Sequence, residues 1–288
     1  MIFLIYVITG PTGVGKTNLS IKLAKKLNAS IINCDSMQIY KELNIGTAKI
    51  KEEEMQGIKH YLINIKSVLE DYNVCAYQKD ARKILNELIK ENKNVLIVGG
   101  TGLYLKALLY DYKFDEENII NDYSKYTLEE LVNKIKSINN TIDIDFNNRR
   151  RVERALQKIE NNVESTSNKN VKLYDFKLIC LTRKKDNLYN NINLRVDRMI
   201  KEGLTQEAYN LYQKNIHTRA INTAIGYKEL YLYFDKELTL DEAIDKIKLN
   251  SRKYAKRQLT FFRNQFSDIK WYNLDEMDEE DIIKDILS

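Results

Sequence analysis

The sequence GPTGVGKT, residues 10–17, decides the fold, because it matches the phosphate-binding pattern GxxxxGK[ST]. An apolar, β-rich run precedes it at residues 2–8, and leucines follow at helical spacing at Leu19, Leu23 and Leu27. In such a strand–loop–helix unit, successive backbone N–H groups converge on a phosphate at the helix N-terminus. The pattern predicts a diphosphate site without specifying ATP, and the alternative is a glycine-rich turn that binds nothing.

The whole loop is the candidate diphosphate site. Lys16 adds a mobile positive charge, and the Thr17 hydroxyl is a candidate ligand for a magnesium ion bound with the diphosphate. We therefore expect magnesium as a cofactor. The loop residues are Gly10, Pro11, Thr12, Gly13, Val14, Gly15, Lys16 and Thr17.

The composition argues against several classes of protein. With 288 residues, 43% of them hydrophobic, the chain is long enough for one large domain with an insertion. Cys34, Cys75 and Cys180 show no CxxC spacing, and only His60 and His217 supply imidazole, so neither zinc nor disulfides are expected. No apolar run has the length of a membrane span, and the N-terminal run lacks the flanks of a signal peptide. We expect a cytoplasmic protein without a membrane partner.

Two basic segments suggest an RNA partner. The net charge is only +5, but residues 251–265, SRKYAKRQLTFFRNQ, contain five basic side chains and no acidic one, interleaved with aromatic rings. Residues 149–154, RRRVER, place four arginines around one glutamate. Basic groups neutralise phosphates and aromatic faces stack on unpaired bases, a combination suited to single-stranded RNA. The alternative is a solvated helix face beside an aromatic core seam.

The order of predicted elements indicates the fold class. Strands predicted at residues 30–33 and 176–183 and a helix at 80–91 continue the strand–helix alternation that begins at the loop. This alternation predicts an α/β fold, a doubly wound parallel sheet like that of the P-loop NTPases, with a small helical insertion and a C-terminal helical region.

The domain boundaries follow from changes in composition. The insertion is polar, and the pair Thr127 and Glu130 predicts a capped helix within it. After about Phe266 we expect an acidic tail. The predicted parts are the sheet core at 1–110 and 146–185, the insertion at 111–145, and the helical region at 186–288 that completes the core.

Two polar stretches follow predicted strands, where ligands of doubly wound sheets bind. Asp35 and Ser36 come just after the second strand, so the Asp35 carboxylate is expected near the phosphate loop as a proton acceptor. An N-cap role is the alternative for Asp35. Residues 99–104, GGTGLY, allow a close approach to a ligand that Thr101 could contact, or they form only a tight turn.

These motifs occur in the order of a known family. GPTGVGKT, DSMQIYKELNIGTAK, HYLINI, VGGTGLYLKALL, RRRVERAL, RVDRMIKEGL, AIGYKEL and YAKRQLTFFR together resemble the bacterial tRNA dimethylallyltransferases between Ile5 and Phe266. The resemblance implies transfer of a dimethylallyl group from dimethylallyl diphosphate to the exocyclic amine of the adenosine beside the anticodon. The opening loop would then hold the diphosphate, and no nucleoside triphosphate would be consumed.

The resemblance also implies roles for individual residues. Asp35 is the implied base, Thr101 contacts the substrate near the reacting groups, and Arg195 or Arg198 adds charge at the diphosphate. A monomer is implied, with the tRNA anticodon stem-loop as partner. The implied tRNA-binding residues are Asp35, Ser36, Met37, Gln38, Arg150, Arg151, Val152, Glu153, Arg154, Lys256, Arg257, Gln258, Phe261 and Arg263.

The chain departs from the family pattern in places. The segment between GGTGLY and RRRVER is short and contains no arginine, and Phe261 stands where tryptophan is usual. Alternative functions are a small-molecule or nucleotide kinase, an isopentenyltransferase acting on free adenine nucleotide, and a noncatalytic RNA-binding protein. The basic segment at residues 251–265 argues against the kinase, and the long C-terminal helical region argues against the isopentenyltransferase of free nucleotide. The intact loop with Asp35 argues against the noncatalytic protein.

Overall fold

The computed structural model describes residues 4–114, 121–142, 144–161 and 168–288. The chain divides into two compact units, one formed by Met1–Tyr110 with Lys172–Ser288 and the other by Asp111–Val171. In the part of the chain that is described, no helix combines the length and apolarity needed to cross a lipid bilayer.

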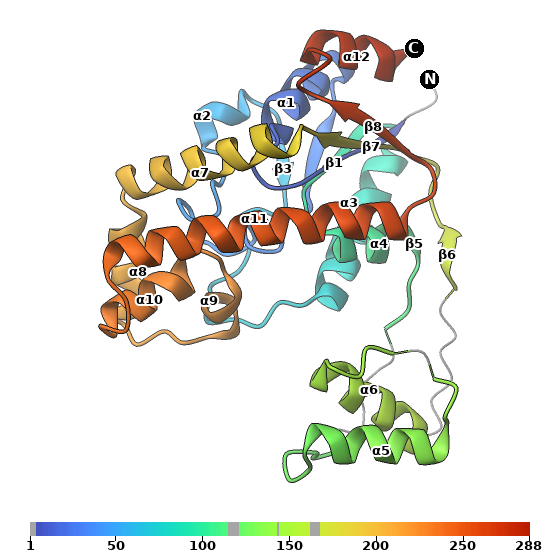
Figure 1. The fold of residues 1–288 in the computed structure, drawn as a ribbon. Helices are drawn as coiled ribbons and strands as arrows, with labels where there is room; N and C mark the ends of the chain where they lie inside the picture. The colour runs from blue at the N-terminus through green and yellow to red at the C-terminus, as the bar shows by residue number, and fades with distance from the viewer. Residues whose placement is uncertain (1–3, 115–120, 143, 162–167) are drawn as a thin grey trace. The chain divides into compact units, whose positions relative to one another are not determined.

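The first unit is built on a six-stranded sheet with the order β3-β2-β4-β1-β7-β8, in which every strand pair is parallel (Figure 1). The strands are β1 (Ile5–Thr9), β2 (Ser30–Asn33), β3 (His60–Tyr61), β4 (Val95–Val98), β7 (Lys177–Thr182) and β8 (Ile269–Asn273). The helices of this unit are α1 (Lys16–Leu27), α2 (Glu52–Met55), α3 (Val74–Lys90), α4 (Gly102–Leu109), α7 (Lys185–Lys201), α8 (Leu204–Tyr212), α9 (Arg219–Thr223), α10 (Tyr227–Phe234), α11 (Leu240–Gln265) and α12 (Glu279–Leu287). The predicted α/β fold with a parallel sheet is confirmed.

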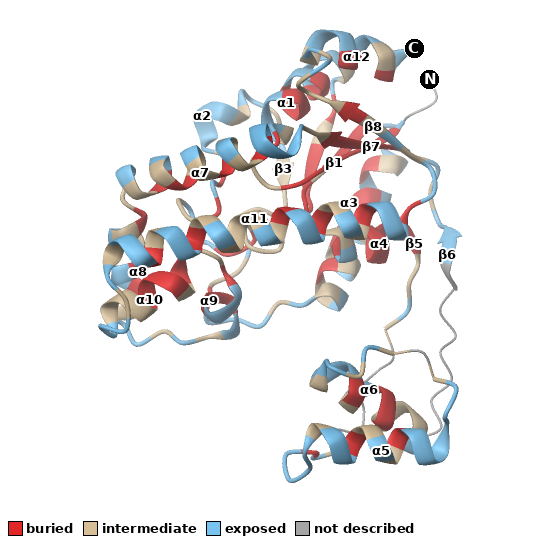
Figure 2. Ribbon diagram, viewed as in Figure 1, coloured by how far each residue is buried: buried red, intermediate tan, exposed pale blue. Residues whose placement is uncertain are grey.

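Alternate side chains of the central strands enter two separate cores, as the period of two in a strand requires. Val7 of β1 faces a core with α3, α4 and the end of α11, whereas its neighbours Tyr6 and Ile8 face a core with α1, α7 and α12. Both faces of the sheet are therefore covered at its centre, where β1 and most of β7 are coloured as buried in Figure 2. Such two-sided burial explains why β1 reads as a continuous apolar run. Ile2 and Phe3, the first residues of the predicted strand, lie outside the described residues.

Two elements differ from the expectation. The helix expected at 80–91 begins earlier, because the Asn73 side chain accepts hydrogen bonds from the N–H groups of Cys75 and Ala76 and so caps α3. The acidic tail expected after Phe266 instead forms β8 and α12. β8 extends the sheet beside β7, and α12 packs on the α1 face, where Ile283 is fully buried.

A third core holds the helical part of the first unit together. Residues of α7, α8, α9, α10 and α11 share this core with Tyr40 and Leu43, which follow β2. The loop after β2 is thus fixed by helices that come some 160 residues later in the chain, as in the Asn44–Glu207 contact. Because that loop starts at Asp35, the helical region helps to shape the site.

The second unit contains α5 (Leu128–Ile138) and α6 (Arg149–Glu160), and a two-stranded sheet of β5 (Tyr110–Asp111) and β6 (Asn168–Lys172) joins its two ends. The predicted cap is confirmed, because Thr127 and Glu130 form a capping box at the start of α5. We expected α6 in the sheet core, but its Leu156 packs with Ile135 of α5 in a core of their own. Residues 115–120 and 143 of the predicted insertion lie outside the described residues.

Candidate active site

The phosphate loop joins β1 to α1 and has the backbone that an anion site needs. Gly10 and Gly15 have φ values of 142° and 114°, where residues with a Cβ are strained. A Cβ on Gly10 would also lie 2.5 Å from the carbonyl oxygen of Leu181. Gly15 is the N-cap of α1 and has no side chain to cap it, so the N–H groups of the first turn can bind an anion.

Lys16 lies against the same loop. Its Nζ donates hydrogen bonds of 2.9 Å to the carbonyl oxygens of Gly10 and Pro11. Burial and the neighbouring Arg195 charge lower the pKa of Lys16 to about 8, and the Asp35 carboxylate opposes this shift. The ammonium therefore occupies a site where its charge is poorly solvated, and an incoming anion would be attracted strongly.

Asp35 and Thr101 lie close together because β2 and β4, which precede them, are neighbours in the sheet. The Ser36 N–H donates to Thr101 Oγ1 at 3.1 Å, and the Thr101 N–H donates to the Cys34 carbonyl at 3.2 Å. Asp35 Oδ1 accepts the Met37 N–H at 2.9 Å. Residues 36–39 form a turn and no helix, so Asp35 orders a turn and is not a helix cap.

A cavity of about 210 Å³ opens beside these loops, and we call it the central cavity. Thr12 of the phosphate loop, Asp35 and Arg195 all line it, together with Tyr254 and Arg257 of α11. Most of its apolar walls come from the third core, and Ile192 comes from the core that faces α1. The remaining lining residues are Ser36, Met37, Gly46, Thr47, Ile192, Val196, Met199, Leu204, Thr223, Ala224, Ile225, Gly226, Lys228, Ile247 and Ser251.

The two candidate arginines of α7 occupy different places. Arg195 lines the central cavity and donates to the Thr47 carbonyl at 3.1 Å. Burial lowers the pKa of Arg195 from its usual value, and the Asp35 carboxylate acts in the opposite direction. Arg198 is exposed and is not among the lining residues. The geometry therefore favours Arg195 as the group that faces a ligand.

Glu207 of α8 organises the loop that carries Thr47, and sequence reasoning missed it. Its carboxylate accepts hydrogen bonds from the backbone N–H groups of Asn44, Ile45 and Gly46. It also accepts the hydroxyl proton of a buried tyrosine on α10, Tyr227. No local signal marks Glu207, since its backbone partners are 161 to 163 positions earlier in the chain and Tyr227 is 20 positions later.

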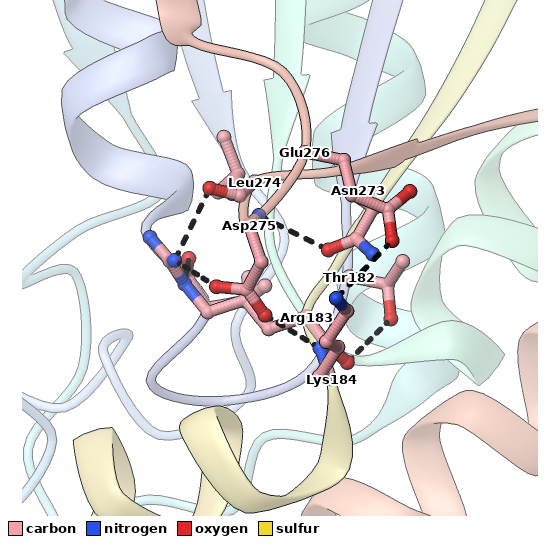
Figure 3. A network of polar contacts seen from close by, with 8 residues as sticks. Thr182, Arg183, Lys184, Asn273, Leu274, Asp275 and Glu276 are labelled. Atoms are coloured by element: carbon pink, nitrogen blue, oxygen red, sulfur yellow. Dashed lines mark hydrogen bonds and ion pairs between the residues drawn. The ribbon is translucent and has the colours of Figure 1, made fainter.

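Arg183 ties the phosphate loop to the C-terminal part of the sheet (Figure 3). Its guanidinium donates to the Val14 carbonyl at 3.2 Å and to Asp275 Oδ1 at 2.7 Å. The other oxygen of Asp275 accepts the Lys184 N–H at 2.6 Å. Burial raises the pKa of Asp275, but these donors outweigh it and hold that pKa below its usual value. Sequence reasoning did not identify this pair either.

The basic segment of α11 has two faces. Lys256, Arg257 and Arg263 are exposed, whereas Gln258 and Phe262 are buried. An exposed basic face and the alternative core seam therefore coexist on one helix, since residues three and four apart share a face. RNA binding by the exposed face stays a prediction.

Two predicted RNA contacts on α11 point inward. Phe261 is half-buried, and a Cβ added to Gly102 would lie 2.2 Å from its ring, so the ring packs on the start of α4. Gln258 is 6% exposed and bonds to Thr12 and Gly100. Gln38, a predicted RNA contact in the turn after β2, donates from Nε2 to the Thr47 carbonyl at 3.3 Å.

The predicted tRNA-binding residues of α6 lie in the second unit. Val152 is fully buried in that unit's core, so its side chain is a packing residue. Arg149 and Glu153 form an ion pair at 2.7 Å on the helix. Three arginines of α6 are exposed: Arg150, Arg151 and Arg154.

A glycine-rich loop at the end of the central strand, with a lysine and a strand-end carboxylate beside it, is the arrangement of a P-loop protein. The model of the IPP transferase family matches residues 38–265. The chain therefore belongs to the IPP transferase family.

Known relatives are similar over nearly the whole chain. A tRNA dimethylallyltransferase of Anoxybacillus flavithermus is 46% identical over 94% of this chain and 90% of its own length. A crystal structure of the tRNA isopentenylpyrophosphate transferase of Bacillus halodurans, 40% identical, covers 98% of this chain and 94% of its own with a TM-score of 0.78. A eukaryotic dimethylallyltransferase acting on tRNA, 26% identical, covers 100% of this chain and 80% of its own with a TM-score of 0.83.

Proposed function

We propose that this protein is a prenyltransferase that moves a dimethylallyl group from dimethylallyl diphosphate to the exocyclic amine of the adenosine beside the anticodon of tRNA, releasing diphosphate. Relatives at 46% and 44% identity carry the name tRNA dimethylallyltransferase. One observation supports the proposal most: Thr12 of the phosphate loop, Arg195 and Asp35 line one cavity. An anion-binding loop and a candidate base thus face the same space.

The diphosphate is the leaving group of this reaction. When the bond between the allylic carbon and the diphosphate oxygen breaks, negative charge grows on that oxygen. Lys16, the N–H groups at the start of α1 and Arg195 are placed to stabilise it. Their fixed positions mean that little reorganisation is required as the charge develops.

The adenine amine is a weak nucleophile because its lone pair is delocalised into the ring. As the amine nitrogen forms its bond to the allylic carbon, it must lose a proton, and Asp35 is the proposed acceptor. Oδ1 of Asp35 accepts one N–H from Met37. A carboxylate with one such bond retains acceptor sites for the amine proton.

Magnesium is part of the proposal. Thr17 stands in the first turn of α1 and is exposed, so its hydroxyl would be the protein group that holds the metal ion. When bound, magnesium would neutralise charge on the diphosphate.

RNA binding requires that the target adenine leave its stack, at a cost of a few kcal/mol. The exposed basic groups of α11, Lys256 and Arg257, lie on the helix that also lines the central cavity. Contacts of these groups with RNA phosphates would offset that cost. We further propose that the protein acts as a monomer in the cytoplasm.

The test is to incubate the protein with radiolabelled dimethylallyl diphosphate, magnesium and unmodified tRNA. Label is expected in the RNA. Label in free adenine nucleotide instead would indicate an isopentenyltransferase of small molecules, and tRNA-stimulated ATP hydrolysis would indicate a kinase or helicase-like activity. Absence of transfer to any acceptor, with RNA bound, would leave only an RNA-binding role.

A further inference from the structure

The amide of Gln258 joins two loops of the candidate site. Its Oε1 accepts the backbone N–H of Thr12 at 2.9 Å, and its Nε2 donates to the Gly100 carbonyl at 2.9 Å. These loops follow β1 and β4, which are paired in the sheet with Ile8 opposite Val98. Gln258 itself comes from α11, 246 positions after Thr12.

Both ends of this bridge reach groups that the proposed reaction needs. Thr12 lies in the phosphate loop and lines the central cavity. Gly100 precedes Thr101, whose hydroxyl accepts the Ser36 N–H beside Asp35. One side chain therefore sets the spacing between the diphosphate side and the base side of the cavity.

We propose that Gln258 is a positioning residue for prenyl transfer, which holds the phosphate loop and the Thr101 turn at the separation that the reaction requires. The proposal rests on the proposed function. It replaces the RNA contact implied by the family resemblance, because a side chain 6% exposed with both amide atoms engaged has little left to offer a base.

The chemistry of an amide suits this place. Glutamine presents one acceptor and one donor from the same planar group, matching one N–H and one carbonyl. A carboxylate at this position would accept from Thr12 but could not donate to Gly100. An apolar side chain would leave both backbone groups without a partner.

Gln258→Glu and Gln258→Met test the bridge. For both, we expect kcat/KM for dimethylallyl diphosphate to fall by about 10- to 100-fold, the range that small misplacements of reacting groups cause. The Kd for tRNA without donor should stay within about twofold of wild type, since neither variant changes the exposed face of α11. Lys256→Ala should show the opposite pattern: it should weaken tRNA binding and leave the KM for the donor unchanged.

A second substitution, Gly100→Ala, disturbs the same bridge from the loop that follows β4. A Cβ at Gly100 would lie 2.2 Å from Gln258 Nε2, so Gly100→Ala pushes the amide away without altering α11. In a Gln258→Ala background the amide is gone, and the nearest remaining atom is the Gly10 carbonyl oxygen at 3.3 Å, a much milder contact. We therefore expect the two substitutions to be strongly non-additive in kcat/KM for the donor, with the double variant close to the worse single variant.

Several outcomes would overturn the proposal. Raised tRNA Kd with unchanged donor kinetics would make Gln258 an RNA contact. A lowered melting temperature with normal kinetics would make it a packing residue, and additive effects would show that Gly100→Ala acts elsewhere. If the wild type transfers no prenyl group to tRNA, the proposed function fails. Calorimetric binding of dimethylallyl diphosphate then still tests Gln258, because wild-type affinity in both Gln258 variants would contradict its positioning role.

Discussion

The central cavity and the exposed face of α11 both carry positive charge, but they hold it under different physical conditions. Arg195 lines the cavity and Lys16 lies against the phosphate loop beside it; both are partly enclosed, and burial lowers the pKa of each. On α11, Lys256 projects into solvent and does not line the cavity. Enclosed charges act over short distances on one ligand with little screening, whereas exposed charges act additively on an extended polyanion and are screened by salt.

Because the two sets of charges differ in solvation, they should affect different measurements. A change at the cavity should alter the donor and the chemical step, with little dependence on ionic strength. A change on the exposed face should alter RNA affinity and its salt dependence.

Asp35→Asn should have the largest effect. The asparagine oxygen can still accept the Met37 N–H, so the turn is preserved, but an amide cannot take the amine proton. We expect the single-turnover rate of prenyl transfer to fall by about two to four orders of magnitude at unchanged tRNA Kd. A nearly normal rate would reduce Asp35 to the structural role of ordering its turn.

Lys16 should make the use of dimethylallyl diphosphate dependent on pH. Its pKa of about 8 means that the charged form predominates below pH 8 and is lost as the pH rises through that value. The kcat/KM for dimethylallyl diphosphate should therefore be highest below pH 8 and fall by about tenfold per unit well above it.

Lys16→Arg is the matched variant for this profile. Arginine stays charged across the range, so the decline above pH 8 should disappear even if the maximum is lower, because arginine does not reproduce the lysine geometry. A decline that persists in Lys16→Arg would assign the titration to another group, such as the buried Lys49, whose pKa burial also lowers to about 8.

Glu207→Gln should have an intermediate effect. The neutral amide accepts more weakly than the carboxylate, and its NH₂ end opposes backbone N–H groups, so the loop at residues 44–46 should loosen. We expect a loss of about 1–3 kcal/mol in unfolding free energy. A raised KM for the donor should accompany it, because Arg195 bonds to Thr47 in the same loop.

Glu202→Gln, an exposed change at the end of α7, is the control for this loss. Denaturant unfolding and donor kinetics of the two variants decide the matter. Equal stabilities would contradict the role assigned to Glu207.

Lys256→Ala should have the smallest effect, confined to RNA. Removal of one phosphate contact should raise the tRNA Kd a few-fold and reduce the slope of log K against log salt by about one unit. Lys214→Ala removes an exposed charge outside α11 and should change neither quantity. An unchanged salt slope in Lys256→Ala would remove this residue from the RNA surface.

The parts of the candidate site also differ in how well the sequence predicts them. The phosphate loop could be predicted because the backbone of such a loop requires glycines and a lysine at fixed spacing in the sequence. Asp35 and Thr101 followed from strand ends and from the rule that ligands bind at the carboxyl edge of a parallel sheet.

Contacts between distant elements could not be predicted in this way. Glu207, Arg183 and Asp275 are polar residues on ordinary helices and loops, and only the packed fold brings them to the site. The inward direction of Gln258 and Phe261 likewise depends on how α11 is rotated about its axis. Their segment was read as one basic and aromatic run, although helical geometry separates it into two faces.

The last strand of the sheet has a consequence for how the protein is made. β1 pairs with β7 at residues 177–180, and β7 pairs with β8 at residues 269–273. During synthesis the edge of β7 therefore stays open until nearly the whole chain has left the ribosome. Pairings so distant in sequence form slowly. We expect the nascent chain to depend on chaperones during that interval, and a premature stop before Ile269 to yield an aggregating product and not a shortened enzyme.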